Sequence, residues 1–249
     1  MTETDPNRYV ERKKRKYTSV IFDLDGTILD RPSTVPQEAN LAALKLLCPM
    51  QYDIAALEHG LKQVYAQTTQ ERGFLVPKRK QFALLLKNLG IFANNLVEKL
   101  FQEYLRRYLS LVDLFPDAVE TLTKLSNLGM RIGLATNGTE DLVNCVIEHF
   151  NLHDVFDFVV TSSHVGSPKP SKRYSDFLIK QAEVGPHEIL VVGDGEEDAI
   201  TAEMIGAAFI SVDQTQHVVQ TETTSFRVVH SLSEIVPICL NSLTRTKDE

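Results

Sequence analysis

The sequence predicts an α/β protein, in which helices cover a parallel sheet and a second, all-helical domain is inserted. Short apolar runs rich in β-branched residues alternate with longer amphipathic stretches, which is the pattern of βαβ units. One block, from about residue 32 to 112, has helical spacing and no convincing strand. A chain of 249 residues, 43% of them hydrophobic, is long enough for one core and an inserted domain.

Six apolar runs predict the strands of the sheet. Ser19–Phe22 is the first buried strand, and 226–230 is the weakest of the six. The other strand candidates are 130–135, 157–161, 188–192 and 207–212. The segments with helical spacing between them are 117–128, 139–149, 171–184 and 196–205. Because helices of this length connect the strands, we expect right-handed crossovers and a parallel sheet with both faces covered.

The block at 32–112 is predicted to form three to five helices. Large apolar residues recur in it at helical periods, and its segments are separated by turns that contain Pro49, Gly73, Pro77 and Gly90. An all-helical block between the first strand and the rest of the sheet is best explained as an insertion. We therefore divide the chain into a basic leader (1–16), a core (17–31 and 113–249) and a helical domain (32–112).

Composition and charge exclude several classes of protein. The net charge is −7, yet the first 16 residues carry six basic and three acidic side chains. We interpret them as a solvated leader, with a nucleic-acid contact or a targeting address as alternatives. The acidic remainder argues against a nucleic-acid binder, and no run is long enough for a membrane helix. Because three scattered cysteines indicate a reducing compartment, we expect a cytoplasmic protein and leave its oligomeric state open.

The strongest chemical signal is Phe22-Asp23-Leu24-Asp25-Gly26-Thr27, directly after the first strand. Two carboxylates at the end of a strand are costly to bury unless a cation or a ligand uses them. Ligands of open α/β sheets bind at the carboxyl ends of the strands. We therefore predict that Asp23 and Asp25 belong to a binding or catalytic site, with an ordinary acidic turn as the alternative.

Three further groups of polar residues follow later strands. Thr136-Asn137-Gly138 offers a hydroxyl and an amide to an anion, or else caps a helix. Ser167-Pro168-Lys169-Pro170 holds a lysine on a stiff loop, or else is a surface turn. Gly193-Asp194-Gly195-Glu196-Glu197-Asp198 adds carboxylates, or else is an acidic helix start. Each group is weak evidence alone, but four groups at one edge of a sheet indicate a single site.

With these four groups the sequence resembles the haloacid dehalogenase superfamily of phosphohydrolases. It matches the motifs of that family as DxDGT, TNG, the lysine of SPKP, and GDxxxD. The resemblance implies a Rossmann-like (flavodoxin-like) parallel sheet core, and the helical insertion lies where the family has a type 1 cap. It also implies that the cofactor is Mg²⁺ and that the partner is a small phosphorylated metabolite, with no nucleic acid and no membrane.

The resemblance assigns catalytic and phosphate-binding roles. Asp23 would be the nucleophile that forms an aspartyl-phosphate, and Asp25 would be the general acid and base. The phosphate-binding residues would be Thr136, Asn137, Lys169 and Thr27. Attack of a carboxylate on phosphorus brings two anions together, so a lysine and a hard, oxygen-ligated cation are the partners this chemistry needs.

The resemblance also implies a metal site. Asp23, Asp25 and Asp194 would hold Mg²⁺, and Asp198 would act on it through water. The fourth motif differs from that of many family phosphatases, because Glu197 stands before Asp198 where they often carry Asn. Glu197 is therefore a further candidate contact in the metal site.

The activity implied is hydrolysis of a small-metabolite phosphomonoester by a Mg²⁺-dependent phosphatase. Carbon–halogen hydrolases of the superfamily lack an acidic residue two positions after the first aspartate, since a halide leaves without a proton and an alkoxide does not. Asp25 therefore argues against a dehalogenase. A sugar phosphomutase of the same superfamily is the first alternative, and a catalytically idle binding protein is an alternative of another class.

Substrate selectivity is assigned to the helical domain, because the four motifs bind only a phosphoryl group and a metal. Within it, Glu71-Arg72-Gly73-Phe74 and Lys78-Arg79-Lys80 form a basic stretch on an otherwise acidic chain. We predict that this stretch faces an anionic or hydroxylated substrate and that Arg72→Ala changes the ranking of substrates. The alternative for each of these bases is a solvated helix start.

Overall fold

A computed structural model of the chain describes residues 15–50, 52–92, 95–214 and 226–241. Residues 1–14, which make up most of the predicted basic leader, lie outside the described residues. None of the helices in the described ranges is long and apolar enough to cross a membrane.

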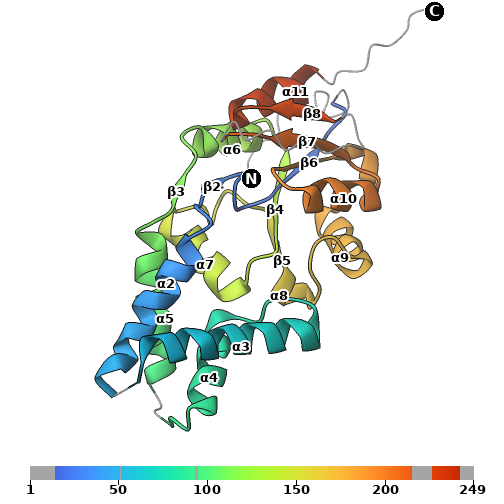
Figure 1. Cartoon of the computed structure of the whole chain (residues 1–249). Helices are drawn as coiled ribbons and strands as arrows, with labels where there is room; N and C mark the ends of the chain where they lie inside the picture. Colours follow the sequence, from blue (N-terminus) through green and yellow to red (C-terminus); the bar gives the residue numbers. More distant parts are fainter. Residues whose placement is uncertain (1–14, 51, 93–94, 215–225, 242–249) are drawn as a thin grey trace, which may run out of the picture.

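The core is built on one six-stranded sheet within the described residues. Its order is β5-β4-β1-β6-β7-β8, and every neighbouring pair is parallel. All six predicted strands are confirmed: β1 (Ser19–Phe22), β4 (Arg131–Thr136), β5 (Phe158–Thr161), β6 (Ile189–Gly193), β7 (Ala208–Val212) and β8 (Arg227–Val229). The chain runs outward from β1 to β4 and β5, then continues on the other side of β1 with β6. The topological switch point therefore lies at β1 (Figure 1).

Helices cover both faces of this sheet, as predicted. Val20 and Phe22 of β1 lie in one buried cluster, whereas Ile21 lies in the other, because successive side chains of a strand point to opposite faces. The first cluster includes residues of α6 (Ala118–Asn127), α7 (Glu140–His149) and α11 (Ile235–Asn241). The second includes residues of α8 (Ser162–Val165), α9 (Lys172–Ala182) and α10 (Glu196–Ile205). Two of these helices, α8 and α11, were not expected from periodicity, since each has fewer than eight residues.

The inserted domain is helical, as predicted. Its helices are α2 (Val35–Leu44), the 3₁₀ segment η1 (Lys45–Met50), α3 (Ile54–Arg72), α4 (Lys78–Asn88) and α5 (Leu96–Leu109). Helix α3 begins where the Asp53 side chain accepts a hydrogen bond from the amide of Ala56, and it ends at Gly73 in the left-handed conformation. Buried aromatic side chains such as Phe82 and Tyr104 join α4 to α5. These helices form a separate layer beyond the sheet (Figure 1).

A two-stranded antiparallel ribbon connects the two parts of the chain. It pairs β2 (Leu29–Asp30) with β3 (Asp113–Leu114), so the connections into and out of the helical domain lie side by side. This ribbon was not expected, because two-residue strands are too short to show an alternating pattern. It lies beside the predicted domain boundaries at 31/32 and 112/113.

Candidate active site

The four motif groups meet at the carboxyl edge of the sheet. Asp23 follows β1, Thr136 ends β4 and Asp194 follows β6, and both β4 and β6 pair directly with β1. These groups surround a cavity of about 340 Å³. Its lining residues are Asp23, Asp25, Arg31, Leu75, Thr136, Asn137, Gly138, Lys169, Asp194, Gly195, Glu197 and Asp198. The prediction that these strand ends share one region of space is therefore correct.

Lys169 connects two of the carboxylates. Its ammonium group lies 2.6 Å from Oδ1 of Asp23 and 2.6 Å from Oδ1 of Asp198, and it donates to the carbonyl oxygen of Ala135 at 2.8 Å. The Lys169 side chain is only 4% exposed. Although burial alone would lower its pKa, the attraction of Asp23 and Asp198 raises it above the ordinary value. Lys169 is therefore a fixed positive charge in contact with Asp23.

Three carboxylates form a cluster that could hold a metal ion. Oxygen atoms of Asp23, Asp194 and Asp198 lie within 4.8 Å of one another. Asp194 approaches closely because Gly26 has no side chain: a Cβ at Gly26, whose φ is +81°, would lie 2.1 Å from Asp194 Oδ2. Asp198, expected to act through water, is buried within this cluster, and Asp25 is not one of its members.

The cluster disfavours negative charge in the absence of a cation. Burial raises the pKa of Asp23 well above its usual range, and the charge of Asp198 adds to this rise while Lys169 opposes it. Burial and the charge of Asp198 together raise the pKa of Asp194 to about 6. A divalent cation bound between these oxygen atoms would favour the ionised forms.

Asn137 holds the backbone of Lys169 with both ends of its amide. Its Oδ1 accepts from the Lys169 amide N–H at 2.7 Å, and its Nδ2 donates to the Lys169 carbonyl at 3.0 Å. The same Nδ2 donates to Glu197 Oε2 at 2.7 Å. Asn137 therefore positions Lys169, and Glu197 contacts Asn137 and lies outside the three-carboxylate cluster.

The two threonines predicted to bind phosphate differ in position. Thr136 is buried, and its hydroxyl accepts from the amide of Gly138 at 3.0 Å at the wall of the cavity. Thr27 is fully buried and does not line the cavity, and its hydroxyl has no hydrogen-bond partner among the described residues. Its carbonyl oxygen accepts from Gln214 at 2.7 Å. Thr27 therefore lies in the loop behind the site, away from where a ligand would bind.

A family model described as haloacid dehalogenase-like hydrolase matches residues 20–212. The chain belongs to this family. Because the family consists of hydrolases and the similar curated proteins include phosphatases, the chain is an enzyme of the hydrolase class. The expected family and the expected Rossmann-like core are both confirmed.

Similar proteins include two named phosphatases. A phosphoglycolate phosphatase of Pseudomonas savastanoi pv. phaseolicola is 27% identical over 227 residues, which cover 89% of this chain and 79% of that protein. A ribulose-1,5-bisphosphate 5-phosphatase of Halopiger xanaduensis is 26% identical and covers 83% of this chain and 89% of its own. The solved 2-haloacid dehalogenase of Pseudomonas syringae pv. tomato has a TM-score of 0.72 at 20% identity, covering 92% of this chain and all of that one, and shares the fold.

Arg31 is a site residue that the motifs of this haloacid dehalogenase-like hydrolase did not identify. Its Nε lies 2.7 Å from Oδ1 of Asp25 in an ion pair, and it lines the same cavity. The carboxylate of Asp25 is therefore held by a cation, separately from the three-carboxylate cluster. The only hint in the sequence was a basic residue eight positions after Asp23, which on its own is uninformative.

Two polar residues behind the site were also missed. The Tyr174 hydroxyl is buried and donates to the carbonyl of Val160 at 2.8 Å. Ser162 donates to the carbonyl of Asn137 at 2.8 Å. These bonds connect the end of β5 and the loop after β4 to the helices α9 and α8. No sequence motif marks them.

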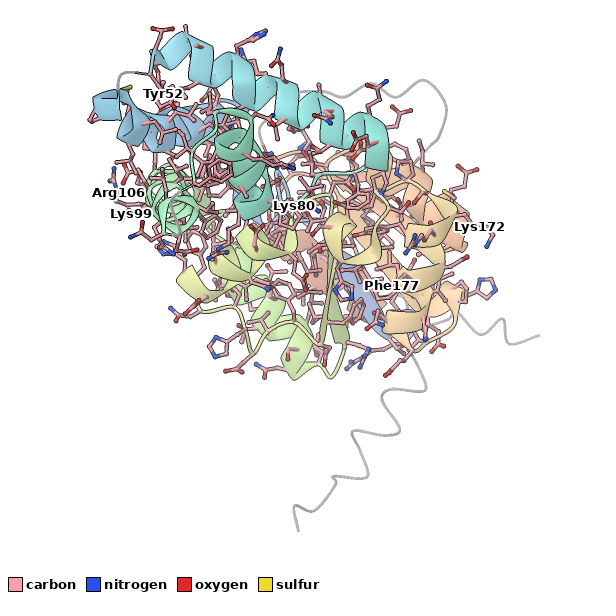
Figure 2. The ribbon with its side chains drawn as sticks, turned by 90° about the horizontal axis from the view of Figure 1, so that it is seen from below. Tyr52, Lys80, Lys99, Arg106, Lys172 and Phe177 are labelled. Atoms are coloured by element: carbon pink, nitrogen blue, oxygen red, sulfur yellow. The ribbon has the colours of Figure 1, made fainter. Side chains whose placement is uncertain are left out.

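A second cavity, of about 440 Å³, adjoins the first one and is lined by both the core and the helical domain. Of the predicted basic stretch, Lys78 lines this cavity, whereas Arg79 pairs with Glu98 on α5 at 2.8 Å and Lys80 is exposed. Figure 2 labels Lys80 on α4. The side chain of Arg72 lies outside what the structure describes, so its predicted role stays a prediction.

Proposed function

We propose that the protein is a Mg²⁺-dependent phosphatase that hydrolyses a small phosphomonoester through an aspartyl-phosphate on Asp23. The observation that carries this proposal is the position of Asp25, which lines both cavities. A carboxyl group there could protonate an alkoxide that leaves from the first cavity toward the second. A halide needs no such proton. The two similar phosphatases support the same chemistry.

The reaction would proceed in two displacement steps. An oxygen of Asp23 attacks phosphorus, the bond from phosphorus to the leaving oxygen breaks, and Asp25 gives its proton to the departing alkoxide. Asp25 then takes a proton from water, whose oxygen attacks phosphorus and releases inorganic phosphate and free Asp23. Lys169 offsets the negative charge that accumulates on Asp23 and the phosphoryl oxygens, and Asn137 keeps Lys169 in position.

The described carboxylates fit Mg²⁺. Asp23, Asp194 and Asp198 offer hard oxygen ligands within 4.8 Å of one another, and Asp25 is engaged by Arg31 instead. The raised pKa values of Asp23 and Asp194 reflect destabilised negative charge, which a divalent cation would stabilise. When bound, Mg²⁺ would offset the charge of the phosphoryl group during transfer.

Asp23→Asn tests the proposal, because an amide keeps the size of the side chain and cannot act as the nucleophile. We expect release of inorganic phosphate from a phosphomonoester panel to fall by at least about 10³-fold, and excess chelator to abolish it until Mg²⁺ is restored. Asp176→Asn, at an exposed residue of α9 paired with Lys172, is the matched control and should keep full activity.

Four results would contradict the proposal. Full phosphate release by Asp23→Asn, or in excess chelator, would exclude the aspartyl-phosphate or the metal, respectively. Isomerisation of a sugar phosphate without net phosphate release would favour the phosphomutase, and halide release would favour the dehalogenase. A cytoplasmic location stays a prediction from the cysteine content.

A further inference from the structure

The cavity between the core and the helical domain continues the catalytic cavity. The two share four lining residues, which are Asp25, Arg31, Leu75 and Gly138. A substrate whose phosphoryl group lies at Asp23 would therefore extend past Asp25 into the larger cavity. Its volume of about 440 Å³ is in the range of ordinary small-ligand pockets, so a metabolite-sized leaving group fits it.

Lys78 is a buried cation at the wall of this cavity. It begins α4 and is only 8% exposed. Its ammonium donates to Gln81 Oε1 at 2.8 Å and to Asn40 Oδ1 at 3.3 Å, and it lies 4.8 Å from the ring centre of Tyr104. All of these partners are neutral.

No carboxylate lies within 4.0 Å of the Lys78 ammonium in the described parts of the chain. The acidic residue that acts on the charge of Lys78 is Asp141, whose oxygen atoms accept from the backbone amides of Lys78 and Arg79 at 3.3 and 3.2 Å. A buried charge without a counter-ion is energetically unfavourable, and pairing with an anion offsets that penalty.

The other charged groups of the cavity leave Lys78 as its available buried cation. Arg31 is paired with Asp25 at 2.7 Å. Lys62 and Glu58 belong to α3, where Lys62 is exposed. Burial lowers the pKa of Lys78 to about 8, with Asp141 opposing the shift, so the ammonium form predominates at pH 7.

We propose that Lys78 binds a second anionic group on the leaving part of the substrate, a carboxylate or a phosphate. This inference rests on the proposed phosphatase function and specifies its substrate class: small phosphomonoesters whose alcohol also carries a negative charge. Asn40 and Gln81 hold the ammonium in place, and Tyr104, Tyr108 and Leu44, which line the cavity, enclose the carbon chain between the two anionic ends.

Two matched substrate pairs test the inference at pH 7 with Mg²⁺. Phosphoglycolate is compared with its neutral amide, and propane-1,3-diol bisphosphate with the monophosphate, so the two arms distinguish a carboxylate from a phosphate. The enzymes are wild type, Lys78→Met, Lys78→Arg and the control Lys80→Met, at the exposed lysine two positions along α4 (Figure 2).

We expect the wild type to prefer the charged member of at least one pair by about tenfold or more in kcat/KM, as one ion pair of about 1.4 kcal/mol would give. Lys78→Met should remove that preference, Lys78→Arg should keep part of it, and Lys80→Met should keep all of it. An unchanged preference in Lys78→Met, or no preference in the wild type, would overturn the inference. Melting curves of each variant establish that it is folded.

A binding experiment without turnover separates this inference from the proposed function. Malonate at millimolar concentration should raise the melting temperature of wild type and Lys80→Met, and should not raise that of Lys78→Met. If no phosphomonoester is hydrolysed but malonate binding depends on Lys78, the phosphatase proposal is wrong and the anion site stands. If phosphate is released but malonate binding and substrate preference are the same in wild type and Lys78→Met, the anion-site proposal is wrong and the phosphatase proposal stands.

Discussion

Asp25 lines both the cavity of about 340 Å³ beside Asp23 and the cavity of about 440 Å³ between the core and the helical domain, so its side chain can reach a group in either one. The carboxylate is outside the three-carboxylate cluster and is paired with Arg31. Arg31 therefore holds the carboxylate of Asp25, while Lys169 pairs with the carboxylate of Asp23. The two acidic residues of this motif, Asp23 and Asp25, are therefore paired with different cations, Lys169 and Arg31.

Asp25→Asn should reduce turnover in proportion to the leaving group's need for a proton. We expect kcat to fall by about 10²- to 10⁴-fold for an alkyl phosphate and by less than about tenfold for nitrophenyl phosphate, whose phenolate leaves without protonation. Steady-state kinetics on both esters measures the difference. Asp30→Asn, at the exposed end of β2, is the matched control. Equal losses on both esters would mean that Asp25 only holds Arg31 or the loop.

The sequence was sufficient for residues whose position follows from the sheet. Asp23 and Asp194 follow strands, and Thr136 ends one, that were predictable from their apolar runs, and parallel strands end at one edge. The sequence was insufficient for residues whose burial depends on how the helices pack. Nothing in the run Lys78-Arg79-Lys80 indicated that the first lysine is buried and the third exposed, because that depends on how α4 packs.

At the scale of elements, the first turn of α4 in the helical domain is capped by Asp141, a residue of the core. Pro77 precedes the helix and offers no side-chain cap, so the first amides of α4 donate to Asp141 of α7 instead. The Arg79 guanidinium also lies 4.0 Å from Asp141, and within the helical domain it pairs with Glu98 and lies 3.6 Å from the ring centre of Phe101 on α5. The start of α4 therefore fastens the helical domain to the core.

Asp141→Asn should loosen this attachment for every substrate alike. We expect kcat to fall and KM to rise together by about threefold to tenfold, because the closed site depends on the cap contact. Stability should fall by about 0.5–2 kcal/mol, as for loss of a helix cap. Steady-state kinetics on the two matched substrate pairs measures kcat and KM, and chemical denaturation measures the loss of stability. Glu148→Gln, at an exposed acid of the same helix, is the control, and a change in substrate preference alone would contradict this role.

The connection between the two domains shows why elements differ in predictability. Long helices such as α3 and α5 repeat their apolar positions over several turns, so their existence follows from periodicity. The β2–β3 ribbon has two residues in each strand, and it forms because the connections into and out of the helical domain lie side by side. Its position follows from the whole fold, and no local pattern encodes it.

At the scale of the whole molecule, the buried charge of Lys78 lowers the stability of the folded chain. Its ordinary pKa of 10.5 falls to about 8 in the folded chain, chiefly because burial disfavours the charged form. Below pH 8 the lysine is protonated in both the folded and the unfolded chain, and the folded state carries a penalty of roughly 3 kcal/mol. Between pH 8 and 10.5 the unfolded chain binds one more proton, so the penalty shrinks as pH rises.

Lys78→Met should therefore stabilise the ligand-free protein at pH 7, by about 1–2 kcal/mol after the lost hydrogen bonds to Gln81 and Asn40 are counted. The gap between variant and wild type, that is, the difference in their free energies of unfolding, should narrow as pH rises from 8 to 10. Asp141 and Tyr104, the ionisable groups that face the ammonium, are present in both proteins and largely cancel in the comparison. Urea denaturation across this range, with Lys80→Met as the exposed control, measures the gap. A gap that stays constant or widens with pH would mean that Lys78 is not a buried charge, and the penalty assigned to it would be wrong.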